Sequence, residues 1–290
     1  MATAEGASHE QKNYYTDPEN AAEMARLTKQ ARLLTKAMGG PLAEQHHLER
    51  VHDILDLACG PGEWAMETAT MYPDKRVTGV DISRLMITYA NFQARQHNIN
   101  NVQFRTMDIL QPLEFPDQSF DLVNIRLIAS FMFRTRERGW PELVQECVRV
   151  TRPGGIIRLT DCEWFVSTSP VCEQYFNLCL QAVHLAGNKF SPDGRHLTTT
   201  PMLARFLRDV GCRNVQHKAF AVDCSADADG HQIFYEDMMV FLKLLQPLLV
   251  QTRVADQEEV ETLYQRSLQA IRQPDFNCLW YFLTAWGERP

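Results

Sequence analysis

The sequence lacks an apolar run of about 18 residues, the minimum length for a helix that crosses a bilayer, so we expect no membrane span. The N-terminal segment MATAEGASHEQKN is polar and lacks the apolar stretch of a secretory signal. No internal repeat or low-complexity segment stands out in the 290 residues. These absences predict a cytoplasmic protein built on an ordinary packed core.

Regular cysteine spacing and positive net charge are missing as well. The eight cysteines are scattered and none forms a CxxC pair, so we predict neither a disulfide framework nor a metal site. The formal net charge is −7. Because binding to a phosphate backbone requires a basic surface, the sequence predicts no nucleic-acid partner.

The chain does contain a regular alternation of strand and helix patterns from residue 51 to residue 164. The expected strands are 51–58, 76–81, 102–108, 120–126 and 156–164, with helices at 62–71, 83–97 and near 137–150. Such alternation is typical of a parallel sheet covered by helices on both faces.

Helical patterns flank this alternation on both sides. A first helix is expected to begin at Asp17 and Pro18 and to end before Gly39. After residue 164 the rhythm changes to helices at 170–187, 200–211, 231–250 and 256–272, with strands at 214–223 and 276–286.

The segment ILDLACGPGEW (54–64) joins the first strand of the alternation to its first helix. Gly60 and Gly62 allow a ligand to approach the backbone, and the start of the helix offers unpaired N–H groups. The spacing Gly60-x-Gly62-x-x-Ala65 also fits a relaxed dinucleotide pattern, and a turn without any ligand has the same form.

Acidic residues at the strand ends distinguish between the candidate cofactors. Asp81 follows the glycines by about 20 residues, where a carboxylate binds ribose hydroxyls, although it could equally cap the next helix. Asp56 suits the amino-acid end of a sulfonium cofactor, and Asp108 suits an adenine amino group. A nicotinamide dehydrogenase needs no acid at Asp108 and usually has a second catalytic domain, which the sequence lacks.

In order and spacing, five segments resemble the class I S-adenosylmethionine-dependent methyltransferases. The resemblance is strongest to the small-molecule branch that includes the ubiquinone and menaquinone biosynthesis type. The segments are ILDLACGPGEW, VTGVDIS, MDIL, FDLVNIR and RPGGIIRLTD, which span roughly residues 51–163. The resemblance implies a Rossmann-like, doubly wound α/β sheet of seven strands. The sheet is mostly parallel, its last strand is antiparallel and inserted between strands five and six, and a helical cap is added.

The resemblance also implies a domain division and a set of cofactor-binding residues. Residues 1–50 would be a helical extension or lid, and 51–290 the catalytic domain, with cap insertions at about 165–198 and 230–272. The expected cofactor-binding residues are Asp56, Gly60, Gly62, Asp81, Ile82, Met86, Asp108, Ile109 and Arg126. The glycines would pass the methionine moiety. Arg126 would lie near the transferred methyl group or, alternatively, face solvent.

Two residues are candidates for a catalytic role. Tyr15 could close over the sulfonium, because aromatic faces attract cations, or it could simply anchor the chain terminus. His184 could act as a general base, or it could be a packed residue of an amphipathic helix. Glu163, at the end of a strand, is interpreted either as a base or as a hydrogen-bonded carboxylate.

Aromatic residues near the strand ends suggest the nature of the methyl acceptor. Phe131, Trp164 and Tyr175 are the predicted acceptor-binding residues, and core packing is the alternative explanation for them.

The leading functional hypothesis is methyl transfer from S-adenosylmethionine to a small, partly apolar or aromatic metabolite by in-line displacement, with S-adenosylhomocysteine as the product. A protein methyltransferase is the main alternative. An NAD-dependent oxidoreductase and a non-catalytic cofactor-binding protein are weaker ones. The first helix could swap between subunits and produce a homo-oligomer.

Overall fold

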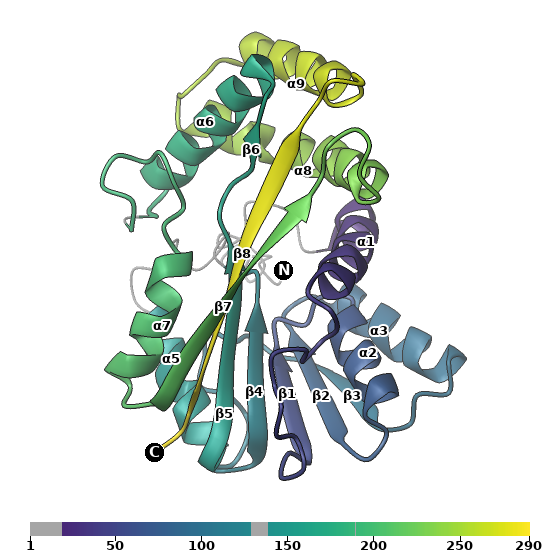
Figure 1. Ribbon diagram of the computed structural model, residues 1–290, viewed down its shortest axis with the longest axis vertical. Helices are drawn as coiled ribbons and strands as arrows, with labels where there is room; N and C mark the ends of the chain where they lie inside the picture. Colours follow the sequence, from purple (N-terminus) through teal and green to yellow (C-terminus); the bar gives the residue numbers. More distant parts are fainter. Residues whose placement is uncertain (1–18, 129–138, 189) are drawn as a thin grey trace, which may run out of the picture.

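The computed structural model describes residues 19–128, 139–188 and 190–290. A mixed sheet in the order β3-β2-β1-β4-β5-β8-β6, with β7 also paired to β8, forms its centre (Figure 1). The strands are β1 (Asp53–Leu57), β2 (Arg76–Asp81), β3 (Val102–Thr106), β4 (Phe120–Arg126), β5 (Thr151–Cys162), β6 (Val166–Ser167), β7 (Arg213–Asp223) and β8 (Cys278–Glu288).

The first five strands pair in parallel, and their order reverses at β1. Leu57 of β1 is in register with Val80 of β2 on one side and with Ile125 of β4 on the other. In open α/β sheets the crevice at such a switch point, outside the carboxyl ends of the strands, is where ligands bind.

The last strand is antiparallel, as the sequence predicts. β8 pairs with β5 along one edge and with β7 along the other, so it lies between the fifth strand and the next long strand. The two-residue strand β6 adds an eighth member, because Val166 continues the β5 side of β8 and pairs with Leu279. The fold class is therefore confirmed, with one short strand beyond the expected seven.

Helices cover both faces of the sheet. They are α1 (Ala21–Ala37), α2 (Glu63–Met71), α3 (Arg84–Gln96), α5 (Trp140–Val150), α6 (Pro170–Leu185), α7 (Thr200–Asp209), α8 (His231–Gln251) and α9 (Gln257–Ile271). Successive strand residues point to opposite faces. Ile54 accordingly packs in a core with residues of α2 and α3, whereas Leu55 and Leu57 pack with residues of α5 and α7.

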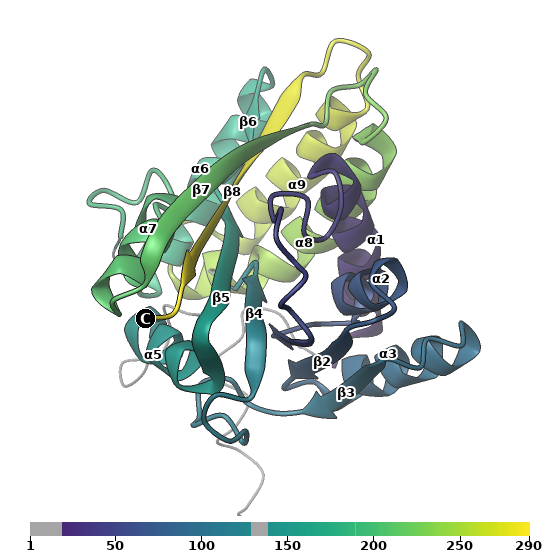
Figure 2. The same cartoon turned by 60° about the horizontal axis from the view of Figure 1, so that its bottom comes forward.

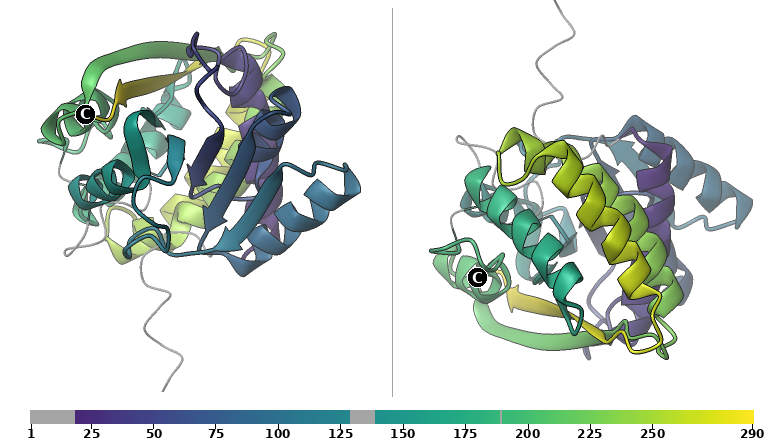
Figure 3. Two further views of the ribbon diagram at one scale, coloured as in Figure 1. Left: turned by 90° about the horizontal axis from the view of Figure 1, so that it is seen from below. Right: turned by 90° about the horizontal axis from the view of Figure 1, so that it is seen from above.

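A third apolar core lies among α6, α8 and α9 and the parts of β7 and β8 that these helices cover. Figures 2 and 3 show these three helices gathered over one end of the molecule, with α1 alongside α8. They fall within the cap ranges predicted from the sequence. The domain boundary at residue 50 stays a prediction.

The start of α1 corrects one expectation. Asn20 is the N-cap, and its side-chain oxygen accepts from the backbone N–H of Ala22 at 2.8 Å, so the helix begins three residues later than the Asp17 cap implies. Asp17 lies outside the described residues.

No helix in the described part of the chain combines the length and the hydrophobicity that crossing a bilayer requires.

Candidate active site

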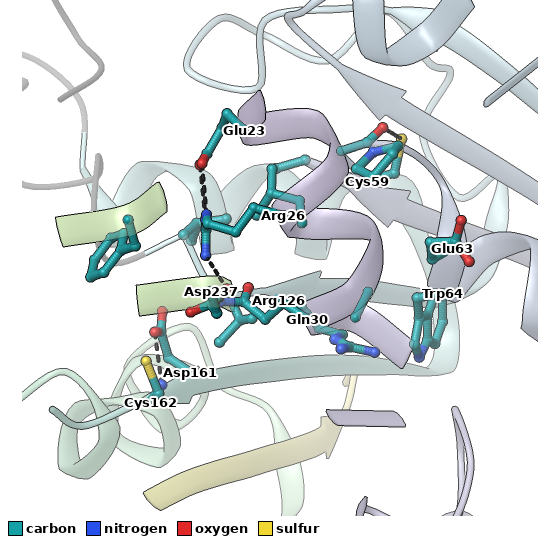
Figure 4. A pocket seen from close by; sticks show the side chains of 18 of the residues that line it. Glu23, Arg26, Gln30, Cys59, Glu63, Trp64, Arg126, Asp161, Cys162 and Asp237 are labelled. Carbon is teal, nitrogen blue, oxygen red and sulfur yellow. Dashed lines mark hydrogen bonds and ion pairs between the residues drawn. The ribbon is translucent and has the colours of Figure 1, made fainter. Parts of the chain in front are cut away.

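A cavity opens at the carboxyl ends of the parallel strands, at the switch point of the sheet. Strand ends supply Asp56 from β1, Asp81 from β2, Arg126 from β4 and Asp161 from β5. Helices α1 and α8 form the opposite wall, and Figure 4 shows side chains of both converging with the strand ends. The sheet and its cap therefore enclose one site between them.

The glycine loop is fastened to the next strand by a carboxylate. Asp81 accepts the backbone N–H of Gly60 on one oxygen and that of Ser83 on the other, each at 2.9 Å. Burial raises the pKa of Asp81, and these two hydrogen bonds offset only part of that rise. Ser83, not Asp81, is the N-cap of α3, since its hydroxyl accepts from Met86 N–H at 3.1 Å. Each Asp81 oxygen retains lone-pair capacity for a further donor.

The two glycines have different roles. Gly60 has φ +55° and lines the cavity, and a Cβ there would make only ordinary contacts, at 3.9 Å from Met86 and 4.0 Å from Leu27. Gly62 has φ +83° and is the N-cap of α2, and a Cβ there would lie 2.7 Å from the Phe104 ring and 2.9 Å from Ala90. Gly62 therefore serves close packing of the loop and does not line the cavity.

Opposite charges lie side by side at the base of the cavity. Asp56 accepts from the Asn124 amide at 2.7 Å, and burial raises its pKa to about 7 against the lowering effect of that bond and of two arginines. Arg126 donates to the Thr35 hydroxyl at 3.0 Å, and burial together with repulsion from Arg158 lowers its pKa to about 10. Arg126 lies in the cavity and does not point to solvent (Figure 4).

A buried ion cluster links α1 to α8 across the cavity wall. Arg26 donates to Glu23 at 2.7 and 2.8 Å and to Asp237 at 2.8 Å, and Gln30 donates to Asp237 at 3.2 Å. Burial raises the pKa of Asp237, although Arg26 opposes the rise. Sequence reasoning missed this cluster. Glu23 and Arg26 are three residues apart on one helix face, but Asp237 is 211 residues away from Arg26.

Aromatic rings form the wall on the side of the cap. Trp164, Phe165, Phe241 and Trp280 all line the cavity. The ring centroids of Trp164 and Phe241 are 5.7 Å apart, and those of Phe165 and Trp280 are 4.8 Å apart. The indole Nε1 of Trp164 is buried without a hydrogen-bond partner among the described residues. Trp164 therefore lines the cavity, and its contact with an acceptor stays a prediction.

Besides Gly62, three further predicted cofactor residues lie outside the lining that the described residues form. Asp108 accepts from Leu110 N–H at 2.9 Å, and Ile109 is buried beside it in the core shared with α5. Ile82 is half-buried just after β2. Their contact with adenine stays a prediction. Asp56, Gly60, Asp81, Met86 and Arg126 do meet in the cavity.

The remaining predicted residues are placed away from the cavity or are not described. Tyr175 is fully buried, and its hydroxyl donates to the Leu242 carbonyl at 3.0 Å. His184 packs against the loop at Gly194, and it is not part of the described lining. Tyr15 and Phe131 lie outside the described residues. The roles assigned to these four residues stay predictions.

Glu163 is a hydrogen-bonded carboxylate that also lines the cavity, and its role as a base stays a prediction. Its carboxylate accepts the backbone N–H groups of Leu197 and Thr198 at 3.1 Å each, and the Thr200 hydroxyl at 2.7 Å. Glu163 therefore ties the loop before α7 to the end of β5.

Comparison with known proteins agrees with this geometry. Residues 54–155 match the sequence model of a family described as a methyltransferase domain. Methyltransferase str2 of Strobilurus tenacellus is 27% identical over 142 residues, which are 49% of this chain and 46% of that protein. Demethylmenaquinone methyltransferase of Listeria welshimeri is 28% identical over 143 residues, 48% of this chain and 56% of that protein. The chain spans about half the length of the curated relatives it matches.

A solved structure extends the likeness over nearly the whole chain at the level of the fold. The YcgJ protein from Bacillus subtilis has a TM-score of 0.51 and 19% identity, covering 91% of this chain and 99% of that chain. The family match identifies a methyltransferase domain at residues 54–155, and the strand order with its antiparallel β8 gives the chain a Rossmann-like sheet.

Proposed function

We propose that this protein transfers the methyl group of S-adenosylmethionine to a small, partly apolar or aromatic metabolite. The observation that carries the proposal is the composition of a single cavity. One end holds the glycine loop and the strand-end carboxylates, and the other end is walled by aromatic rings under α1 and α8.

The residues at the strand ends fit the cofactor. The two carboxylate oxygens of Asp81 suit the two ribose hydroxyls. Each oxygen is held in place by one backbone N–H, of Gly60 or Ser83, and keeps a lone pair for a further donor. Asp56 and Arg126 offer one negative and one positive group for the ammonium and carboxylate of the amino-acid end. Met86, a buried residue in the first turn of α3, adds apolar surface to the cavity lining.

When bound, S-adenosylmethionine supplies a methyl group on a positively charged sulfur, which an acceptor takes by in-line displacement. The chain contributes by holding both partners in line and by excluding water. Helices α1 and α8 exclude water, since the Arg26 cluster locks them together over the cavity. The aromatic wall favours positive charge nearby.

The acceptor end fits a flat, apolar molecule with a polar substituent. Trp164 and Phe241 offer apolar ring surface against which such a molecule can pack. Asp237 offers a carboxylate oxygen on the same helix as Phe241, one turn away. General-base catalysis by His184 or Tyr15 is retained as a prediction only.

A protein substrate is a less favoured alternative. The cover formed by α1 and α8 favours an acceptor small enough to lie beneath it, whereas a protein side chain needs an open approach. The net charge of −7 supports the proposal that the enzyme has no nucleic-acid partner. Its cytoplasmic location stays a prediction. Assembly into a homo-oligomer stays a prediction.

A labelled-methyl assay tests the proposal. Purified protein and methyl-labelled S-adenosylmethionine are incubated with fractionated small-molecule and protein extracts. We expect label in an apolar small-molecule fraction. Phe241→Ala should reduce that labelling, whereas Phe92→Ala, which removes a ring that is 50% exposed on α3, should not. Label that appears only in protein would overturn the substrate class.

A further inference from the structure

A row of buried polar residues crosses the middle of the sheet. Asp56 on β1 is in register with Asn124 on β4, and Asn124 is in register with Arg158 on β5. Their exposed fractions are 3%, 0% and 1%, although the neighbouring positions on the same strands are apolar. Burying three polar side chains is costly unless each is satisfied, so the row demands an explanation.

Hydrogen bonds connect the row from end to end. Glu44, in the turn after α1, forms a buried ion pair with Arg158. Arg158 donates to the Asn124 carbonyl oxygen at 2.7 Å, and Asn124 donates from its amide nitrogen to Asp56 at 2.7 Å. The chain of contacts therefore begins at Glu44 and ends at a carboxylate that lines the cavity.

The donors and acceptors of these side chains fix the direction of each hydrogen bond in the row. A guanidinium has only donors, so it requires the oxygen of the Asn124 amide and thereby turns the amide nitrogen towards Asp56. That nitrogen donates to the carboxylate and favours its ionised form. Glu44 in turn fixes the guanidinium through its own carboxylate. Each residue orients the next one.

The surroundings of Asp56 explain why its ionised form needs the hydrogen bond from Asn124 and the nearby positive charge of Arg158. Burial raises the pKa of Asp56, and the nearby carboxylate of Asp81 raises it further. The Asn124 hydrogen bond and the charges of Arg126 and Arg158 lower it, and the balance gives about 7. Without the row, the pKa of Asp56 would be higher still, and a smaller fraction of its carboxylate would be ionised to receive a cation at neutral pH.

We propose that Asn124 and Arg158 are positioning residues: anchored by Glu44, they hold Asp56 in the orientation and charge state that receives the ammonium group of S-adenosylmethionine. This inference rests on the proposed function. It goes beyond that function by assigning part of the cofactor's affinity to residues that do not touch the cofactor. It also accounts for the polar row inside an otherwise apolar sheet.

Asn124→Asp is the direct test, because the new carboxylate still accepts from Arg158 but no longer donates to Asp56. Binding of S-adenosylmethionine is measured by calorimetry between pH 6 and pH 8. The comparison ligand is 5′-methylthioadenosine, which has the adenosine and the sulfur but no amino-acid tail. Arg158→Lys is the second variant. Thr284→Val is the control, since it removes a buried hydrogen bond to Thr160 at 2.9 Å in the same sheet.

For the unmodified protein we expect S-adenosylmethionine affinity to fall as the pH drops through about 7, with no such fall for 5′-methylthioadenosine. Asn124→Asp should weaken S-adenosylmethionine binding about tenfold at pH 7.5 and move the midpoint of the fall about one unit higher. Arg158→Lys should also weaken S-adenosylmethionine binding and raise the midpoint of its pH dependence. This variant provides the test if Asn124→Asp does not fold. The control should bind both ligands normally.

Two results would overturn the inference: an unchanged pH profile in both variants, or equal weakening of both ligands, which indicates a purely structural role. Failure of the unmodified protein to bind S-adenosylmethionine would instead refute the proposed function itself.

Discussion

Replacing Asp81 by asparagine separates its two possible roles, cofactor binding and support of the α3 start. The variant keeps one oxygen, so one of the backbone N–H groups of Gly60 and Ser83 loses its acceptor. A hydrogen bond to a charged group contributes about 1.5–3 kcal/mol. Burial raises the pKa of Asp81, so removing its charge regains part of that loss. We therefore expect the free energy of unfolding to decrease by only about 1–2 kcal/mol.

The effect on the ligand should be larger than the effect on stability. The ribose hydroxyls lose a charged acceptor, which predicts S-adenosylmethionine binding weaker by about 10–100-fold, or about 1.4–2.8 kcal/mol. Titration calorimetry and thermal denaturation measure the two quantities on the same samples.

Ser83→Ala is the matched control, because it removes the N-cap of α3 and leaves the Asp81 carboxylate in place. This change should cost about 0.5–2 kcal/mol of stability and leave the affinity within about threefold of the unmodified protein. Normal binding by Asp81→Asn, or an equal loss of affinity in both variants, would show that Asp81 only supports the helix.

Three further predictions concern stability and are measured by thermal or denaturant unfolding. Arg26→Met leaves the buried carboxylates of Glu23 and Asp237 without their cation and should lower the free energy of unfolding by about 3–5 kcal/mol, with a smaller loss at pH 5 than at pH 8. The control is Lys29→Met, which removes a partly exposed ion pair between the same helices and should cost under about 1 kcal/mol. Equal losses would contradict the buried cluster. The pKa of Asp56 is about 7 in the folded protein against an ordinary 3.8, so ionisation of Asp56 lowers stability as the pH rises through that interval. Asp56→Asn should therefore have a higher melting temperature than the unmodified protein at pH 8 but not at pH 4. An equal rise in melting temperature at both pH values would argue against a buried charge. Gly62→Ala should lower the free energy of unfolding by about 2–5 kcal/mol, because the new Cβ overlaps Phe104 and Ala90 and the backbone is strained at positive φ. The control is Gly154→Ala, where φ is +75° but the space is open, and it should cost only about 1–2 kcal/mol. Similar losses in the two variants would rule out the overlap at Gly62.

Much of the fold is predictable because strand and helix patterns are local. The strand 120–126 and the helix near 83–97 appear in the structure with the same or nearly the same bounds. The two-residue strand β6 was not predictable, since its pairing with Leu279 depends on a strand more than 100 residues later. The N-cap was misjudged because Asp17 and Asn20 both have capping side chains, and packing of the helix decides between them.

The site is predictable only as far as each strand end can be located. Asp56, Asp81 and Arg126 follow from strand ends and therefore meet in the cavity. The partner of Arg26 could not be found, because Asp237 is separated from it by most of the chain. Asn124 and Arg158 each stand between apolar neighbours in the sequence, but only the register shows that they lie side by side. Helix periodicity placed His184 on an amphipathic helix without showing which neighbour it faces.

Titration calorimetry with S-adenosylmethionine, S-adenosylhomocysteine and NAD tests the central claim most directly. We predict micromolar dissociation constants for the first two ligands and no binding of the third, because Asp56 and Arg126 match an amino-acid tail and not a pyrophosphate. Binding of NAD, or the absence of any heat with both sulfur compounds, would contradict the assignment of this cavity to methyl transfer.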